Sequence, residues 1–327
     1  MKVLFATYPM AFHTPGGGEI QLLAYQKYLS AHGVKVSLFD PWNPCFLDYD
    51  LVHFFSCIGG SSHFCRFIKN LGLPLVVSSS LWITEETKHL YPIDEIRVQL
   101  DLADCVVTNS DRESDTLSSV LDLSRSKFKT VYNGVDPIFY QQEAAELFQR
   151  KYNIQEKFVL NVGNIEPRKN QLELVRAMKS FPDMKLVLIG HQRDHEYTKA
   201  CLAEGGEQLL YIGPVEHDSP LLRSAYTACE LFCLPSTLET PGLAALEAYV
   251  SGCAVAVTEI GSAIEYFGDK VEYINPNNIQ SIVQAINTTL SKNDLSNDIL
   301  KTLTDAGSLS WQTVTRSLKD IYQLEIK

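Results

Sequence analysis

The sequence predicts an α/β protein made of two doubly wound domains, each with a parallel sheet covered by helices on both faces. At 327 residues the chain is long enough for two domains of ordinary size. Short apolar segments alternate with amphipathic helical segments along its whole length, which is typical of parallel sheets. The apolar segments form two sets of six around a polar interval, so two separate sheets explain them better than one large sheet.

The predicted strands are short and mostly rich in β-branched or aromatic residues. In the first half they are Val3–Thr7, Lys35–Phe39, Leu51–Ser56, Leu75–Ser79, Cys105–Asn109 and Lys129–Tyr132. In the second half they are Phe158–Val162, Lys185–Ile189, Gln208–Ile212, Glu230–Leu234, Ala254–Val257 and Val271–Ile274. Helical patterns between them include Ile20–Ala31, Asp111–Leu121, Gln171–Lys179, Pro220–Ala228, Leu243–Ser251 and Ile279–Leu290.

The domain boundary is expected in a polar segment near the middle of the chain. Residues 141–156 are charged and rich in Gln and Glu, and they follow the turn signal Asn133-Gly134-Val135-Asp136-Pro137. We therefore expect a first domain over residues 1–140, a linker over 141–156 and a second domain over 157–308.

Charge and composition narrow the class of protein. The net charge of −11 argues against a general nucleic-acid binder and against broad attachment to anionic lipid. The eight cysteines are scattered and show no zinc-binding spacing, which indicates reduced thiols and no metal site. We expect no signal peptide, and no apolar segment of the given sequence is long enough to cross a bilayer. We expect a cytoplasmic protein that is at most peripheral at the inner face of a membrane.

Glycine-rich and charged loops follow several predicted strands, where ligands of parallel sheets bind. Gly16 and Gly17 precede the helix from Ile20, where glycines and helix amides favour a phosphate. Arg168 and Lys169 follow Gly163 at the start of the next helix, and two cations there suit a diphosphate.

The segment Glu239-Thr-Pro-Gly242-Leu243 to Glu247 is the most informative one. Pro241 suits a helix start, and we expect the helix to begin at Gly242. Carboxylates on both sides of an anion-binding helix start suit a ligand with hydroxyls at both ends and a diphosphate between them, such as a sugar nucleotide. In the next loop we expect Ser262 to cap a helix.

The chain resembles the family 4 retaining glycosyltransferases, which have the GT-B architecture of two Rossmann-like domains facing across a cleft. The motifs are Gly16-Gly17, Asn133-Gly134-Val135-Asp136, Val162-Gly163…Arg168-Lys169-Asn170, and Pro235-Ser236-x-x-Glu239-x7-Glu247 followed by Gly252. The resemblance covers essentially the whole chain and is most specific in the second half. It also implies that residues 309–327 return to pack on the first domain.

The resemblance implies a role for each site residue. Glu247 would hold the ribose hydroxyls, while Arg168 and Lys169 bind the diphosphate beside Gly163. The amides of Gly242 and Leu243 would meet phosphate or sugar oxygens, and Glu239 would bond to sugar hydroxyls. Gly16 and Gly17 would complete the phosphate site. Glu239, Arg168 and Lys169 are the expected catalytic residues, with no protein nucleophile and no metal.

Two departures from the family pattern stand out. Many relatives have Arg directly after the glycine at the end of the first strand of the second domain, where this chain has Asn164. Many also have a His after the fourth strand, where this chain has Ser78-Ser79-Ser80-Leu81-Trp82. His13 and His53 are candidate substitutes, although a structural or solvated histidine is the simpler interpretation for each.

The function implied is transfer of a sugar from a nucleotide-sugar donor to a glycan or lipid-linked acceptor in cell-surface polysaccharide synthesis. The nucleotide-sugar is a substrate, so no cofactor is expected. Two alternatives stay open: a nucleotide-sugar epimerase of the same architecture and a non-catalytic nucleotide-sugar-binding protein. A dinucleotide oxidoreductase is disfavoured because no Gly-x-Gly-x-x-Gly follows a strand.

Overall fold

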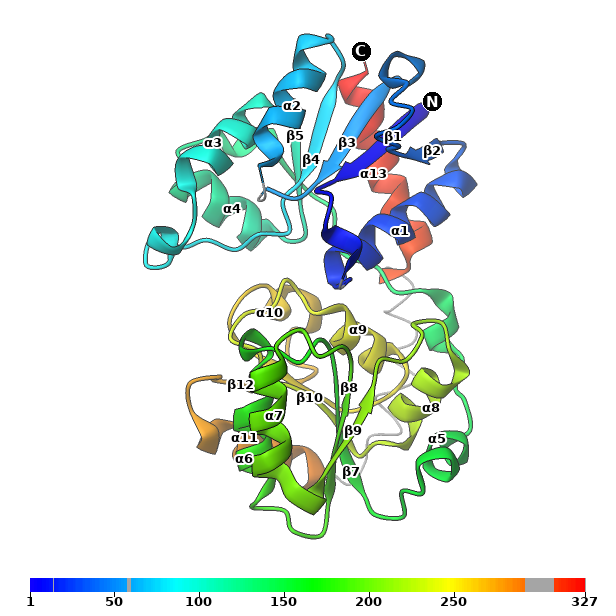
Figure 1. The fold of residues 1–327 in the computed structure, drawn as a ribbon, viewed down its shortest axis with the longest axis vertical. Coiled ribbons are helices and arrows are strands. Elements are labelled where there is room, and N and C mark those ends of the chain that lie inside the picture. Colours follow the sequence, from blue (N-terminus) through cyan, green and yellow to red (C-terminus); the bar gives the residue numbers. More distant parts are fainter. Residues whose placement is uncertain (14, 58–59, 292–308, 327) are drawn as a thin grey trace. The chain divides into compact units, whose positions relative to one another are not determined.

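The computed structural model describes residues 1–13, 15–57, 60–291 and 309–326, and the chain divides into two compact units. Unit 1 comprises Met1–Gly134 and Ser308–Lys327, and unit 2 comprises Val135–Gly307. Each unit contains one six-stranded parallel sheet with helices around it (Figure 1). The α/β class and the two doubly wound sheets predicted from the sequence are confirmed.

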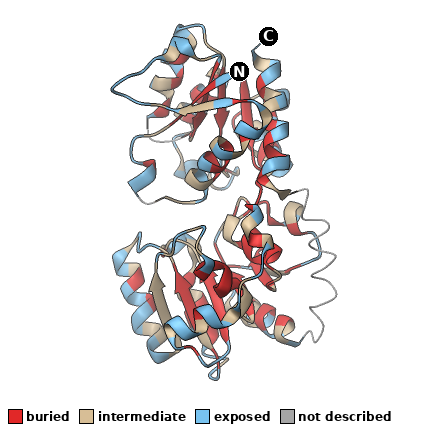
Figure 2. Cartoon of the chain, turned by 90° about the vertical axis from the view of Figure 1, so that its right-hand side faces the viewer, coloured by how far each residue is buried: buried red, intermediate tan, exposed pale blue. Residues whose placement is uncertain are grey.

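The sheet of unit 1 has the order β2-β1-β3-β4-β5-β6. Its strands are β1 (Lys2–Thr7), β2 (Lys35–Leu38), β3 (Leu51–Phe55), β4 (Leu75–Ser78), β5 (Cys105–Thr108) and β6 (Phe128–Thr130). The helices are α1 (Gly17–Leu29), α2 (Ser61–Asn70), α3 (Ile93–Leu102), α4 (Asp111–Val120) and α13 (Trp311–Glu325). Most strand residues of this sheet are buried (Figure 2), which fits a sheet covered by helices.

The last helix belongs to unit 1, far in sequence from the strands it covers. Helix α13 packs beside α1 (Figure 1), and its Tyr322 hydroxyl lies 2.5 Å from Nδ1 of the buried His53 on β3. A Cβ on Gly134 would lie 2.6 Å from the backbone nitrogen of Trp311. Only glycine therefore lets the two backbones approach here, which gives the glycine of the Asn133–Asp136 motif a packing role.

The sheet of unit 2 has the order β12-β11-β10-β7-β8-β9. Its strands are β7 (Phe158–Val162), β8 (Lys185–Ile189), β9 (Leu209–Gly213), β10 (Leu231–Leu234), β11 (Val255–Thr258) and β12 (Glu272–Ile274). The helices are α5 (Ala145–Tyr152), α6 (Gln171–Met178), α7 (His195–Gly205), α8 (Pro220–Ala228), α9 (Leu243–Val250), α10 (Ala263–Phe267) and α11 (Ile279–Ser291).

The segment 141–156, predicted as a linker, lies within unit 2 and contains α5. Phe148 of α5 is fully buried, and its amide donates to the Ser224 hydroxyl of α8 at 2.9 Å. The polar composition of this segment reflects an exposed helix face, which also occurs within a domain. The first unit ends at Gly134, six residues before the predicted end at 140, and residue 308 of the other predicted boundary lies outside the described residues.

Candidate functional site

The strand order of unit 2 reverses direction between β7 and β10, and this position gathers the candidate residues. From β7 the chain continues to β8 on one side, and from β10 it continues to β11 on the other. Loops that leave neighbouring strands in opposite directions open a crevice at the carboxyl end of the sheet, where α/β proteins bind ligands. Gly163, Arg168 and Lys169 follow β7, and the residues from Glu239 to Glu247 follow β10.

Hydrogen bonds hold the two loops together. The Asn170 side-chain amide donates to the carbonyl oxygens of Pro235 at 3.1 Å and Pro276 at 3.0 Å. The Thr237 amide donates to the Arg168 carbonyl at 2.8 Å. The loop after β7 is therefore fixed to the loop after β10 independently of any ligand.

Two glycines permit close backbone contacts at the carboxyl end of the unit 2 sheet. A Cβ on Gly190, after β8, would lie 2.0 Å from the carbonyl oxygen of Gly163. A Cβ on Gly261 would lie 2.0 Å from the carbonyl oxygen of Glu239, with which it forms an isolated parallel bridge. The backbones of Gly163 and Glu239 are thus both positioned by a neighbouring glycine.

Lys169 and Glu239 form a buried ion pair at the centre of the site. The Lys169 Nζ lies 2.5 Å from Glu239 Oε1, and the side chains are only 13% and 6% exposed. Burial alone would raise the pKa of Glu239, but the adjacent Lys169 and Arg168 outweigh it and lower that pKa. Burial lowers the pKa of Lys169, and Arg168 acts in the same direction while Glu239 opposes it. The carboxylate is therefore ionised beside two cations.

Arg168 lies at the exposed edge of the same cluster. Its guanidinium is 3.8 Å from Glu239 Oε1 and 3.1 Å from Glu166 Oε1, and it donates to the Leu238 carbonyl at 3.2 Å. With 47% of its side chain exposed, it can reorient toward a ligand. Both predicted cations thus lie next to the predicted sugar-binding carboxylate.

Glu247 lies on α9 and is only 6% exposed. Its Oε1 is 2.6 Å from His217 Nε2, and its Oε2 accepts a hydrogen bond from the Tyr226 hydroxyl at 3.0 Å. Sequence reasoning missed both partners. The signal that could have found His217 is its position in the loop after the predicted strand Gln208–Ile212.

Helix α9 begins at Leu243, with Gly242 in the capping position at a φ of +90°. Pro241 lies outside the helix after a cis peptide bond, so its predicted place at the helix start is wrong. Gly242 has a backbone conformation that side chains disfavour and that glycine adopts readily. The amides of Gly242 and Leu243 stand at the helix start, where helix amides have no partner within the helix.

Ser262 occupies the capping position of α10, but its side chain makes no capping bond, so that prediction is wrong. Its backbone has φ −104° and ψ 2°, which differ from the extended conformation that brings a hydroxyl to the helix amides. The Ser262 amide instead donates to the Glu239 carbonyl at 3.0 Å. This loop therefore supports Glu239.

Gly16 and Gly17 lie in unit 1 after β1, and Gly17 is the first residue of α1. The Gly16 amide donates to Glu19 Oε2 at 2.7 Å. In this state the predicted phosphate-binding loop is capped by its own carboxylate.

The two candidate histidines of unit 1 differ. His53 is fully buried, with its ring nitrogens 2.5 Å from the Tyr322 hydroxyl and 2.9 Å from the Ser78 hydroxyl, and burial lowers its pKa to about 3. His53 is therefore a neutral, structural histidine. His13 is exposed in a short 3₁₀ helix, Ala11–His13.

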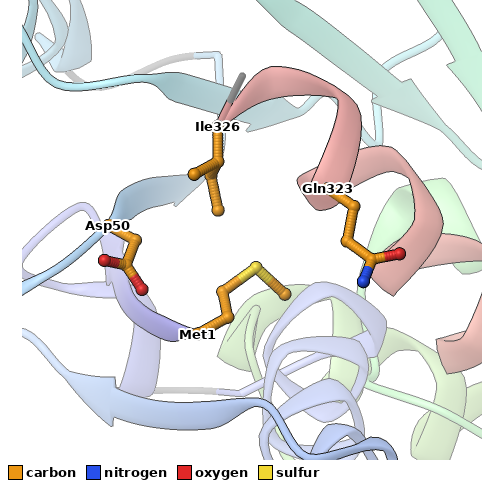
Figure 3. A pocket seen from close by; sticks show the side chains of 4 residues that line it. All are labelled: Met1, Asp50, Gln323 and Ile326. Atoms are coloured by element: carbon orange, nitrogen blue, oxygen red, sulfur yellow. The ribbon is translucent and has the colours of Figure 1, made fainter.

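A pocket in unit 1 lies away from these loops. It is lined by Met1, Asp50, Gln323 and Ile326 (Figure 3). Met1 and Asp50 directly precede β1 and β3, so the pocket lies at the amino edge of that sheet. Ligands of parallel sheets bind at the opposite edge, and we assign this pocket no role.

In the described part of the chain, no three His, Cys, Asp or Glu side chains are grouped so that they could hold a metal ion. None of the described helices has the length and apolar composition needed to cross a bilayer.

The fold of the chain matches solved structures of the GT-B type. A sucrose-phosphate synthase from Thermosynechococcus elongatus superposes with a TM-score of 0.80 at 17% identity, covering 99% of this chain and 98% of the other. Anabaena Alr3699/HepE in complex with UDP-glucose gives a TM-score of 0.80 at 19% identity, covering 99% of each chain. The fold is that of the GT-B glycosyltransferases.

Sequence comparison finds similarity to glycosyltransferases, mainly in the second half of the chain. Residues 144–303 match the model for glycosyl transferases group 1. An uncharacterised glycosyltransferase of Methanocaldococcus jannaschii is 26% identical over 68% of this chain, and the match spans 60% of its own length. The serotype-specific mannosyltransferase WbdA of Escherichia coli is 25% identical over 65% of this chain and 28% of its own length. Residues 144–303 are therefore similar to the group 1 glycosyl transferases, in agreement with the resemblance of the motifs to family 4.

Proposed function

We propose that this protein transfers a sugar from a nucleotide-sugar donor to a glycan or lipid-linked acceptor, with retention of the anomeric configuration and without a divalent metal. The observation that carries the proposal is the cluster at the switch point of unit 2, with Lys169 paired to Glu239 at 2.5 Å and Glu247 on the following helix. HepE has been solved with UDP-glucose, and WbdA is named a serotype-specific mannosyltransferase, which supports a nucleotide-sugar donor and transfer of a sugar.

Different residues of the site bind different parts of the donor. Glu247 accepts the ribose hydroxyls, and Arg168 and Lys169 bind the diphosphate with the amides of Gly242 and Leu243. Glu239 then accepts hydroxyls of the sugar, since the arriving diphosphate offers Lys169 a second anion. The approach of a diphosphate oxygen to Lys169 offsets the weakening of its pair with Glu239.

The chemical step needs stabilisation of charge on the leaving group. The acceptor oxygen bonds to the anomeric carbon as the bond from that carbon to the phosphate oxygen breaks, and the acceptor proton passes to the departing diphosphate. Two cations and helix amides stabilise the negative charge that develops there. Gly16 and Gly17 of unit 1 contribute further amides to the diphosphate, which requires Glu19 to release the Gly16 amide.

We place the enzyme in the cytoplasm, where nucleotide-sugars are used, with peripheral contact at the inner face of the membrane.

Calorimetry on two variants tests the assignment. Glu247→Ala should weaken binding of both the free nucleoside diphosphate and the intact donor. Glu239→Ala should spare the free diphosphate but impair the intact donor and turnover, because it removes a contact made to the sugar. Equal loss of free diphosphate binding in both variants would refute this division. Radiolabel that stays on an epimerised nucleotide, with none in a glycan or lipid, would favour the epimerase alternative.

A further inference from the structure

The Glu247 carboxylate is held from two sides by residues outside its own helix. His217, in the loop after β9, lies 2.6 Å from Oε1, and Tyr226 of α8 donates to Oε2 at 3.0 Å. Because an ionised carboxylate only accepts hydrogen bonds, His217 must carry a proton on Nε2. Burial and the nearby carboxylate raise the pKa of Tyr226 well above its ordinary value, so its hydroxyl keeps its proton.

These two hydrogen bonds leave acceptor positions on the Glu247 carboxylate for a ligand. Each carboxylate oxygen has about two acceptor positions. His217 uses one position on Oε1 and Tyr226 uses one on Oε2. One further position per oxygen suits two neighbouring hydroxyl donors, as in the 2′,3′-diol of a ribose.

His217 is itself placed by the segment that follows the Asn133–Asp136 motif. Its ring packs edge-on against Phe139 of the 3₁₀ helix Pro137–Tyr140, with ring centroids 5.2 Å apart and an interplanar angle of 64°. Asp136 caps that 3₁₀ helix by accepting from the Ile138 amide at 3.1 Å. Asp136 of the motif thus stabilises the 3₁₀ helix whose Phe139 packs against the His217 ring beside Glu247.

The charged groups around His217 come from several elements. Glu247 faces it from α9, and Asp136 and Asp218 contribute negative charge from the two neighbouring loops. Arg223 of α8 donates to the Asp218 carbonyl at 2.9 Å and pairs with Glu143. The surroundings of the imidazole are therefore mainly acidic.

We propose that His217 is a positioning residue which, with Tyr226, orients the Glu247 carboxylate toward the ribose diol and makes the site prefer ribonucleotides over 2′-deoxyribonucleotides. This inference rests on the proposed function, in which Glu247 binds ribose. No bond between His217 and the ligand is required.

The test compares matched pairs of ligands by calorimetry. UDP and GDP, each with its 2′-deoxy counterpart, are titrated into the parent, Glu247→Ala, His217→Ala, His217→Gln and Tyr226→Phe. We expect the parent to bind the ribonucleotide of its preferred base about tenfold or more tightly than the deoxy form. Glu247→Ala should bring the ratio close to one. His217→Ala and Tyr226→Phe should lower it about threefold or more, and His217→Gln should restore it because its amide can donate.

The ratio separates positioning from general destabilisation. A purely structural defect would weaken both ligands of a pair and leave their ratio unchanged. The role of His217 would be wrong, without affecting the proposed function, if His217→Ala kept the parental ratio of ribonucleotide to deoxyribonucleotide affinity. It would also be wrong if His217→Gln had the same ratio as His217→Ala. A parent that binds none of the ligands, or a Glu247→Ala variant that keeps the parental ratio, would overturn the proposed function itself. If His217→Ala does not fold, Tyr226→Phe and His217→Gln still decide the matter.

Discussion

Lys169 and Glu239 neutralise each other in a site that also has to accept an anion. Each is largely buried, and their charged atoms are 2.5 Å apart. Removing one partner of a buried pair leaves the other charge uncompensated, and this costs more than the net value of the pair. Arg168, with 47% of its side chain exposed, keeps water as an alternative partner.

The first prediction separates these two cations. Lys169→Ala and Arg168→Ala should each weaken nucleoside diphosphate binding about tenfold, because each removes a charge-assisted bond. Only Lys169→Ala should also destabilise the protein strongly, by about 3 kcal/mol, since it strands Glu239. Arg168→Ala should cost about 1 kcal/mol or less. Urea unfolding and calorimetry measure the two effects, and the double variant Lys169→Ala with Glu239→Gln should recover stability but not binding.

The second prediction concerns pH. Burial alone would lower the pKa of His217, but Glu247, Asp136 and Asp218 together raise it above 6.5. A raised folded-state pKa gives stability that is complete below the unfolded value of about 6.5 and is lost as pH rises through the folded value. His217→Gln keeps a donor without the charge, so its Tm deficit relative to the parent should be greatest below about pH 6 and shrink above that folded value. A deficit that stays constant from pH 5 to 9 would contradict this.

At the scale of elements, the strands were predictable and the loops were not. All twelve predicted segments overlap a strand, and Phe158–Val162 and Lys185–Ile189 match the observed strand at both ends. Buried strands leave a continuous apolar pattern that is local in sequence. Glu247 could be proposed from its motif, whereas its bonds to His217 and Tyr226 join residues 30 and 21 positions apart, and no local pattern records such a contact.

The third prediction tests the loop that supports Glu239. Gly261→Ala would place a Cβ 2.0 Å from the Glu239 carbonyl oxygen at a φ of +110°, so the bridge between the two residues must move. Gly213, at a φ of +85° with no atom near its missing Cβ, is the control because it shares the unusual backbone without the clash. Gly213→Ala should cost about 1 kcal/mol, whereas Gly261→Ala should lose more stability and also donor binding. Equal unfolding midpoints for the two variants would be inconsistent with this role of Gly261.

At the scale of the whole molecule, the two units have separate cores, and the proposed site residues fall unequally between them. Seven lie in unit 2, namely Gly163, Arg168, Lys169, Glu239, Gly242, Leu243 and Glu247, whereas Gly16 and Gly17 lie in unit 1. The sequence correctly placed these residues in the loops and helix starts that follow β1, β7 and β10, because strand and helix patterns are local features. The sequence could not show that the Gly16 amide donates to Glu19 or that Lys169 forms an ion pair with Glu239, because those contacts depend on side-chain conformation.

The last prediction uses this division to locate the ligand. A ligand that binds only the folded state stabilises it by about 2.7 kcal/mol at one hundred times its Kd. Hydrogen exchange with a saturating nucleoside diphosphate should therefore slow in unit 2, at residues 163–170 and 239–247, where the proposed contacts lie. Amides of Gly16 to Gln21 should also slow, since the proposal has the diphosphate displace Glu19 from the Gly16 amide. Helices α2 and α3 of unit 1 hold no proposed ligand contact and serve as the internal reference.

Protection spread evenly over both units would point to general stabilisation. Protection absent from residues 163–170 would show that Arg168 and Lys169 do not bind the diphosphate. Glu19→Gln provides the matched control: its weaker cap should speed exchange of the Gly16 amide without ligand and leave the response of unit 2 unchanged.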